Sequence, residues 1–281
     1  MIVAAEFAPQ ASQAELTLRY EKRDGRSVLA QRRHHGPLLV QKPFYPEGDE
    51  VCHSVIVHPP GGIVAGDRLD IHVAVEPNAH ALITTPGATK WYRSDGALAE
   101  QHVSITVGSG ARLEWFPQEA IVFNSARARQ TICVELADDA RYLAWDILML
   151  GRIAAQERYT AGRYQQDWRI TRDGMPLWLE RGVISGNSSL LNSPIGLAGC
   201  PVIATLIAVG TAPNAALVAA CRAITAGAEA RVAITALPCV LSARYLGHQV
   251  EDAKNFLQSI WRELRPHYVG RAVQTPRIWS T

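Results

Sequence analysis

The stretch Arg68-Leu69-Asp70-Ile71-His72-Val73-Ala74-Val75 decides the fold class, because apolar residues alternate along it with Asp70, His72 and Ala74. Successive side chains of a β-strand point to opposite faces of a sheet, so this period of two marks a half-buried strand. The same alternation recurs over residues 103–107 and 164–170. Turns follow at Asp24-Gly25, Pro77-Asn78, Gly108-Ser109-Gly110 and Asp173-Gly174. This spacing predicts a mainly β fold, as a sandwich, a barrel or a helically wound β-solenoid, although no clean internal repeat is visible.

The last third of the chain predicts two helices. Thr211 can cap the first helix, which ends at Gly227. A pair of strands is expected around residues 232–237 and 240–245. A second helix is expected over residues 250–264, stopped by Pro266.

The whole chain, residues 1–281, is predicted to be one domain. We expect residues 1–13 to be poorly ordered and residues 185–201 to form a long loop, because no charge run or low-complexity linker surrounds that segment. Hydrophobic residues make up 48% of the chain and charged residues 19%, which is typical of a globular protein.

Charge, cysteine content and hydrophobicity indicate the cellular location and the kinds of partner. A formal net charge of +2, without a basic stripe, argues against nucleic acid as a binding partner. The five cysteines are scattered and form no CxxC pair, which favours free thiols in a reducing compartment. No apolar segment reaches the ~20 residues needed to span a bilayer, and the first 13 residues do not resemble a signal peptide. These features predict a cytoplasmic protein without a membrane partner.

Residues 58–67 read His-Pro-Pro-Gly-Gly-Ile-Val-Ala-Gly-Asp. Two prolines fix the backbone and three glycines free it, so the segment predicts a tight turn between strands. One interpretation is a structural turn in which Asp67 caps backbone donors. The other is that His58 and Asp67 line a polar site. Local chemistry alone favours the first interpretation.

Two further segments carry concentrated polar groups. Residues 84–94 contain hydroxyl groups together with Lys90 and Arg93, which could bind an anion or an acidic partner surface; a wide turn with exposed cations explains them equally well. Residues 113–123 place Glu114 and Glu119 among aromatic and aliphatic residues. An inward-facing carboxylate there must be paired or metal-bound, whereas an outward-facing one needs no partner.

Tight metal sites and catalytic triads are poorly supported. Cys52, His53 and His58 form the only local cluster of soft donors, but adjacent residues of a strand point to opposite faces. No HExxH or GxSxG motif is present. This pattern favours a binding or assembly role.

Taken together, HPPGGIVAGD, TTPGATKWYRS and LEWFPQEAIVF, in this order and spacing, resemble the urease accessory protein D family (UreD, called UreH in some organisms). The resemblance covers roughly residues 16–279 and includes Glu180-Arg181 and the Trp-Arg-Glu-Leu-Arg-Pro string at 261–266. Departures are mild: Ala65, Phe116 and Ala120 stand where the family commonly has glycine, leucine and threonine.

The resemblance implies a non-enzymatic scaffold, or metallochaperone component, in the maturation of the nickel enzyme urease. It implies an irregular, helically wound β-structure with two helices near the C-terminus. Its implied partners are UreF, the GTPase UreG acting through UreF, and the urease apoprotein. Nickel is implied to pass transiently along an internal hydrated route, with no tightly bound cofactor.

A transfer route requires weak oxygen or imidazole ligands, because a strong thiolate site would trap the metal. The candidate route residues are His58, Asp67, Glu114, Glu119 and Glu180. The candidate partner-binding residues are Lys90, Arg93, Trp261 and Trp279, although Trp261 could instead belong to the core.

Two other functions stay open. A β-barrel or cupin-like metalloenzyme would use His58, Asp67 and Glu114 as converging ligands. A plain interaction module would bind partners without an interior route for metal.

Overall fold

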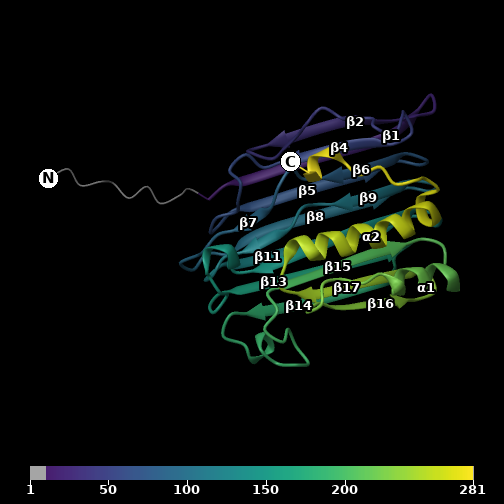
Figure 1. Ribbon diagram of the computed structural model, residues 1–281. Coiled ribbons are helices and arrows are strands. Elements are labelled where there is room, and N and C mark those ends of the chain that lie inside the picture. The colour runs from purple at the N-terminus through teal and green to yellow at the C-terminus, as the bar shows by residue number, and fades with distance from the viewer. Residues whose placement is uncertain (1–10, 281) are drawn as a thin grey trace.

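The computed structural model describes residues 11–280, and Figure 1 shows two layers of strands with helices beside one of them. The first sheet has seven strands in the order β14-β13-β11-β8-β5-β1-β2. The second follows the order β16-β17-β15-β12-β9-β6-β4-β3, with β10 and β7 attached beside β12. The first sheet contains β1 (Gln13–Arg23), β2 (Arg26–His35), β5 (Arg68–Val75), β8 (Ala99–Val107), β11 (Arg127–Leu136), β13 (Arg163–Arg172) and β14 (Met175–Ser185). The second contains β3 (Leu39–Val40), β4 (Cys52–Val57), β6 (His80–Thr84), β7 (Thr89–Trp91), β9 (Arg112–Phe116), β10 (Ala120–Val122), β12 (Arg141–Leu150), β15 (Val202–Val209), β16 (Arg231–Ala236) and β17 (Val240–Gly247).

The chain winds helically between the two sheets. It alternates from β4 to β5, β6, β8, β9, β11, β12 and β13, apart from the short strands β7 and β10. Each winding therefore adds a parallel neighbour to each sheet, as in the pairs β5–β8 and β6–β9. The antiparallel strands β2 and β14 complete the two ends of the first sheet. The predicted mainly β fold is confirmed, and its stacking is that of an irregular β-solenoid.

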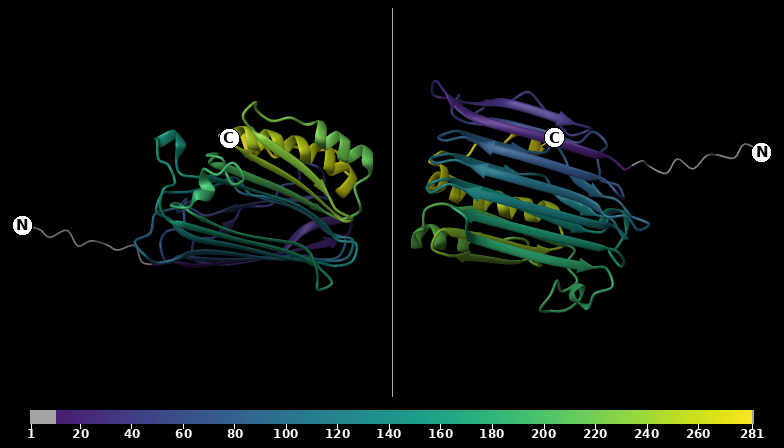
Figure 2. Two further views of the ribbon diagram at one scale, coloured as in Figure 1. Left: turned by 90° about the horizontal axis from the view of Figure 1, so that it is seen from below. Right: turned by 180° about the vertical axis from the view of Figure 1, so that it is seen from behind.

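The main core lies between the sheets. The predicted alternation of residues 68–75 is confirmed on β5, where Leu69, Ile71, Val73 and Val75 are buried and His72 is exposed. The same inward-facing pattern on β8, β11 and β13 fills the space between the layers with branched and aromatic side chains. Figure 2 shows the two layers edge-on.

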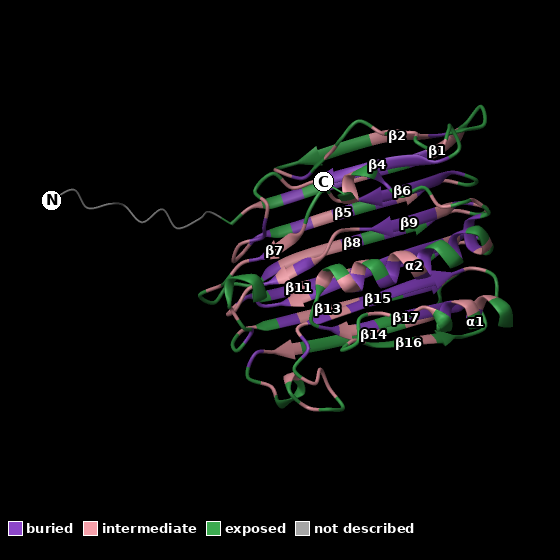
Figure 3. Ribbon diagram, in the orientation of Figure 1, coloured by how far each residue is buried: buried purple, intermediate pink, exposed green. Residues whose placement is uncertain are grey.

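A second core lies beneath the helices. α1 (Ala215–Ala223) and α2 (Val250–Val269) cover the outer face of the second sheet, and α2 lies across β12, β15 and β17. Figure 3 shows that α2 turns a buried stripe toward the sheet and an exposed stripe outward. Phe256, Leu257, Ile260 and Leu264 supply part of that stripe. Among residues 11–280, short 3-10 helices at Ile153–Ala155, Ser189–Leu191 and Arg277–Ser280 lie in loops and in the C-terminal tail.

Three predicted helix boundaries are wrong. α1 ends at Ala223, four residues before the predicted end at Gly227. Asn214, rather than Thr211, caps α1, because its side-chain oxygen accepts a hydrogen bond from the Leu217 N–H at 2.8 Å. α2 continues past Pro266 to Val269 and ends at Gly270, whose φ is +70°. The helix continues because Tyr268 and Val269 are buried in the second core, and this packing outweighs the hydrogen bond that proline removes.

The predicted strand pair in the last third is confirmed as β16 and β17. The long loop expected over residues 185–201 contains the 3-10 helix Ser189–Leu191. Of the segment predicted to be poorly ordered, residues 1–10 lie outside the described residues, and Gln13 begins β1. Within residues 11–280, no helix is long and apolar enough to cross a membrane.

Candidate functional site

A row of glutamines runs along the inner face of the first sheet, which faces the space between the sheets. The parallel registers pair Gln101 of β8 with Gln130 of β11, and Gln130 with Gln166 of β13. Gln130 Nε2 lies 3.4 Å from Gln101 Oε1, and Gln166 Nε2 lies 3.3 Å from Gln130 Oε1. The Tyr164 hydroxyl also donates to Gln130 Oε1, at 2.7 Å. The three amides thus form one hydrogen-bonded row across three strands.

Asp146 faces this row from the opposite sheet. Its neighbours Trp145 and Ile147 belong to the core beneath the helices, so the alternation of β12 points Asp146 into the space between the sheets. Gln166 Nε2 donates to Asp146 Oδ2 at 2.7 Å. Burial raises the pKa of Asp146 to about 6, and the negative charge of Glu180 adds to the rise. We call Gln101, Gln130, Gln166 and Asp146 the polar belt.

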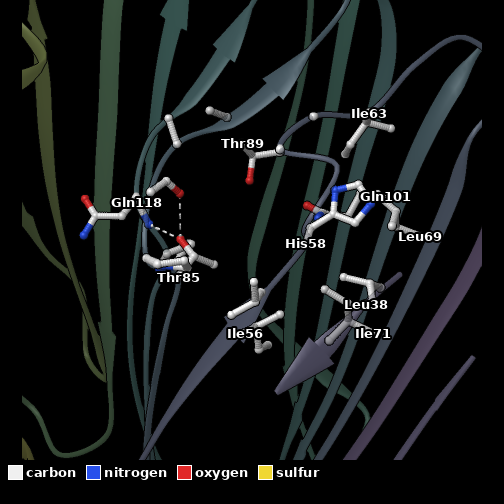
Figure 4. A pocket seen from close by; sticks show the side chains of 18 of the residues that line it. Leu38, Ile56, His58, Ile63, Leu69, Ile71, Thr85, Thr89, Gln101 and Gln118 are labelled. Carbon is white, nitrogen blue, oxygen red and sulfur yellow. Dashed lines mark hydrogen bonds between the residues drawn. The ribbon is translucent and has the colours of Figure 1, made fainter. Parts of the chain in front are cut away.

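One end of the polar belt meets a cavity of about 190 Å³, and Figure 4 shows most of its lining side chains as sticks. Gln101, Gln130 and Asp146 line it together with His58 and the hydroxyl-bearing Thr85. Burial lowers the pKa of His58, and the nearby Asp67 only partly offsets this. A neutral imidazole keeps one ring nitrogen free to accept a proton or a metal ion.

The opposite end of the polar belt lies at the edge of the sandwich. Glu180 of β14 accepts a hydrogen bond from Arg244 Nη1 at 2.8 Å and one from Trp178 Nε1 at 3.2 Å. In the strand register of the second sheet, Arg244 of β17 lies opposite Thr205 of β15. Thr205 in turn lies opposite Asp146 of β12. The Glu180–Arg244 ion pair therefore joins the two sheets at the level of the polar belt.

Asp67 is held by one backbone donor of its own turn and one from the segment before β1. Its Oδ1 accepts from the Ser12 N–H at 2.7 Å and its Oδ2 from the Val64 N–H at 2.9 Å. The side chain is buried. Asp67 therefore caps backbone donors, as the structural interpretation of residues 58–67 expects, whereas His58 lines the cavity.

Glu114 lies on the other side of the second sheet, beneath α2. Its carboxylate accepts a hydrogen bond from Trp261 Nε1 at 2.8 Å and pairs with Arg265, whose Nε lies 2.9 Å from Oε2. His80 Nε2 lies 2.9 Å from Glu114 Oε1, and Glu47 Oε1 lies 2.7 Å from Arg265 Nη2. Glu114 thus satisfies the expectation that an inward carboxylate must be paired.

The remaining route candidate, Glu119, is also ion-paired, with its Oε2 2.6 Å from Lys254 Nζ of α2. The structure therefore brings His58 and Glu180 to the two ends of one belt and holds Asp67, Glu114 and Glu119 elsewhere. His58, Asp67 and Glu114 do not converge as the ligand set of a metalloenzyme, because the second sheet separates Glu114 from the cavity.

The sequence resembles known proteins along nearly its full length. The family model for the UreD urease accessory protein matches residues 12–280. Urease accessory protein UreD of Dechloromonas aromatica is 49% identical over 271 residues, covering 95% of this chain and 94% of its own. UreD of Azoarcus sp. strain BH72 is 50% identical over 269 residues, covering 96% and 94%. UreD of Pseudomonas fluorescens strain Pf0-1 is 48% identical over 280 residues, covering 100% and 99%. The chain belongs to the UreD family.

The candidate partner-binding residues differ in accessibility. Arg93 is exposed, and Lys90 is half-buried on β7, where its carbonyl accepts from the Ile63 N–H. Trp261 is fully buried, which matches the alternative interpretation that it belongs to the core. Trp279, in the C-terminal tail, is partly exposed and donates to the Thr84 hydroxyl at 2.8 Å.

Sequence reasoning missed the centre of the polar belt. Asp146 lies in an apolar strand, Ala-Trp-Asp-Ile-Leu-Met-Leu, where an isolated acidic residue was an available signal. The three glutamines lie in strands of ordinary alternation, and only the register between strands aligns them. Cys52 and His53 point to opposite faces as predicted: Cys52 joins the core between the sheets, and His53 Nε2 lies 2.7 Å from Glu47 Oε1.

Proposed function

We propose that this UreD-family protein is a non-catalytic scaffold of urease maturation, through which nickel passes transiently to the urease apoprotein. In this proposal the protein acts in the cytoplasm with UreF and, through UreF, with UreG, and it holds no resident cofactor. Family membership supports the role in urease maturation. The observation that supports a metal route is the polar belt, which carries a carboxylate and three amides through an otherwise apolar core.

The ligand atoms of the polar belt are better suited to passing nickel on than to storing it. Carboxylate and amide oxygens bind nickel weakly, and the His58 imidazole at the cavity is the strongest donor among them. Within the described residues, no three His, Cys, Asp or Glu side chains are grouped closely enough to hold a metal ion tightly. A row of weak donors allows an ion to exchange from one to the next, whereas a closed site would retain it.

Asp146 is the residue on which the route depends most. A buried carboxylate with a pKa raised to about 6 is costly to the fold, because burial disfavours its charged form. Groups whose pKa is strongly shifted by burial cluster at functional sites. A cationic cargo would stabilise the carboxylate, and proton uptake by the carboxylate would release the cation again.

Complementation tests this function. A urease operon that lacks its D gene is co-expressed with the chain, and nickel-dependent urease activity is measured together with the nickel content of purified urease. The wild-type chain should restore both. Asp146→Asn keeps the side-chain shape and removes the charge, so it should lower both while leaving the amount of folded protein unchanged.

Asp138→Asn is the matched control, because Asp138 is an exposed carboxylate in a surface turn. It should restore urease fully. Full restoration by Asp146→Asn would remove the polar belt from the route. A protein that binds UreF but whose presence changes no nickel loading would instead be the plain interaction module.

A further inference from the structure

Cys200 and His248 meet at the ends of two neighbouring strands. Cys200 lies two residues before β15, and His248 directly follows β17. The antiparallel register pairs Val202 with Gly247, which brings the two side chains together although 48 residues separate them in the chain. Cys200 Sγ lies 3.7 Å from His248 Nε2.

This cysteine differs from the other buried thiols. Cys52 lies in the core between the sheets and Cys221 in the core beneath the helices. Cys200 is 6% exposed yet belongs to neither core. It and the exposed His248 instead line a surface depression of about 910 Å³. Packing alone therefore does not account for this thiol.

The depression offers a polar, accessible setting. Asn187, Ser188 and Asn192 line it with neutral oxygen donors, and Arg158 is the cationic residue in its wall. It shares no lining residue with the cavity at His58. The two features are separate places on the molecule.

The spacing of the two donor atoms fits a shared metal ion. A metal bound at about 2.3 Å to sulfur and about 2.0–2.1 Å to nitrogen, with a tetrahedral angle, separates the two donors by roughly 3.5 Å. The observed 3.7 Å needs almost no side-chain movement. A thiolate with an imidazole is a donor pair that suits nickel, zinc and copper.

We propose that Cys200 and His248 form a two-ligand site for a thiophilic divalent metal ion, and that this ion is nickel. The choice of nickel rests on the proposed function. Two protein ligands leave at least two coordination positions for water or for donors of an incoming protein, so the site holds the ion loosely and can exchange it. Binding replaces the thiol proton, which is released to solvent, by the metal.

The full-length chain is titrated with Ni²⁺, and two signals are followed. One is the near-ultraviolet absorption of a nickel–thiolate bond. The other is alkylation of each cysteine by iodoacetamide, located by peptide mass spectrometry. Nickel should produce the absorption and slow the alkylation of Cys200. His248→Ala keeps the thiol but should lose both effects, and Cys200→Ser should lose the absorption.

Cys133→Ser is the matched control, because Cys133 is a half-buried thiol on β11, away from the depression. It should retain both effects. No absorption, or protection of Cys200 that persists in His248→Ala, would overturn the site. Protection by Zn²⁺ but not by Ni²⁺ would overturn the assignment to nickel.

The nickel titration and the urease complementation, both made with the wild-type chain, can fail independently of each other. If the wild-type chain activates urease while Cys200 shows no nickel-dependent change, the two-ligand site fails and the scaffold function stands. If Cys200 is protected by nickel but the chain does not restore urease, the site stands and the scaffold function fails.

Discussion

The Arg265 guanidinium lies against the Glu114 carboxylate, with Nε 2.9 Å from Oε2, and both side chains are completely buried. Arg265 comes from α2 and Glu114 from β9, 151 residues earlier. Burial alone would raise the pKa of Glu114, but the hydrogen bond from His80 and the charge of Arg265 lower it to about 2. This ion pair fixes α2 on the second sheet.

Removing one partner of this pair should destabilise the protein strongly. Arg265→Ala leaves the Glu114 carboxylate buried without its cation, so we expect the free energy of unfolding to fall by about 3–5 kcal/mol. Urea denaturation measures the loss. Arg262→Ala, on the exposed face of the same helix, should change the stability by less than about 0.5 kcal/mol. Equal losses for the two variants would show that the ion pair does not hold α2.

Asp146 should make the metal-free protein less stable as the pH rises from about 4 to about 6. The pKa of an unfolded aspartate is about 3.9, and in the folded chain the pKa of Asp146 is about 6. Between these values the folded state binds more protons, so stability is lost as the pH increases through this window.

Asp146→Asn should remove this pH dependence. Above pH 6 the variant should be more stable than the wild type by about 3 kcal/mol, which is the free energy of a two-unit pKa difference. Below pH 4 the two proteins should be equally stable. Urea denaturation at pH 4, 5, 6 and 7 provides the comparison. A variant that is less stable than the wild type at pH 7 would contradict the raised pKa.

The N-cap of α1 offers a direct comparison of two neighbouring residues. Asn214→Ala removes the acceptor for the Leu217 N–H and should lower the free energy of unfolding by about 1 kcal/mol. Thr211→Ala should have a smaller effect, because the Thr211 hydroxyl makes a single exposed contact, 3.3 Å from His267 Nε2. Thermal and urea denaturation of both variants test the difference. A larger loss for Thr211→Ala would favour the cap predicted from the sequence.

The C-terminal tail is the candidate docking segment for UreF. Its Trp279 ring packs 4.9 Å from Trp145 and 5.4 Å from Trp261, measured between ring centroids. Deleting residues 276–281 should weaken capture of the chain by UreF in a pull-down, because the deletion removes a partly exposed indole that can anchor a partner. Arg277→Ala, an exposed change that keeps Trp279, is the control. Undiminished capture of the deletion variant would remove the tail from the interface.

Local patterns in the sequence were enough for the fold class and the family. Alternation over residues 69–75 predicts a half-buried strand because each side chain's direction follows from its neighbours alone. The ordered motifs over residues 58–123 identified the family without knowledge of any contact. Helix ends were less predictable. Pro266 argues for a stop by local rules, but the burial of Tyr268 and Val269 carries the helix onward.

The chemistry depended on tertiary structure. Asp146 and Gln166 belong to opposite sheets, Glu114 and Arg265 to a strand and a distant helix, and Cys200 and His248 to the ends of two paired strands. The two residues of each pair are in contact because strand register and the helical winding of the chain place remote segments side by side. The alternation of residues along a strand predicts which face of the sheet a side chain occupies. It does not predict which distant residue lies next to that side chain. The sequence alone therefore determined the strands, the fold class and the family, whereas only the tertiary structure decided which polar groups meet.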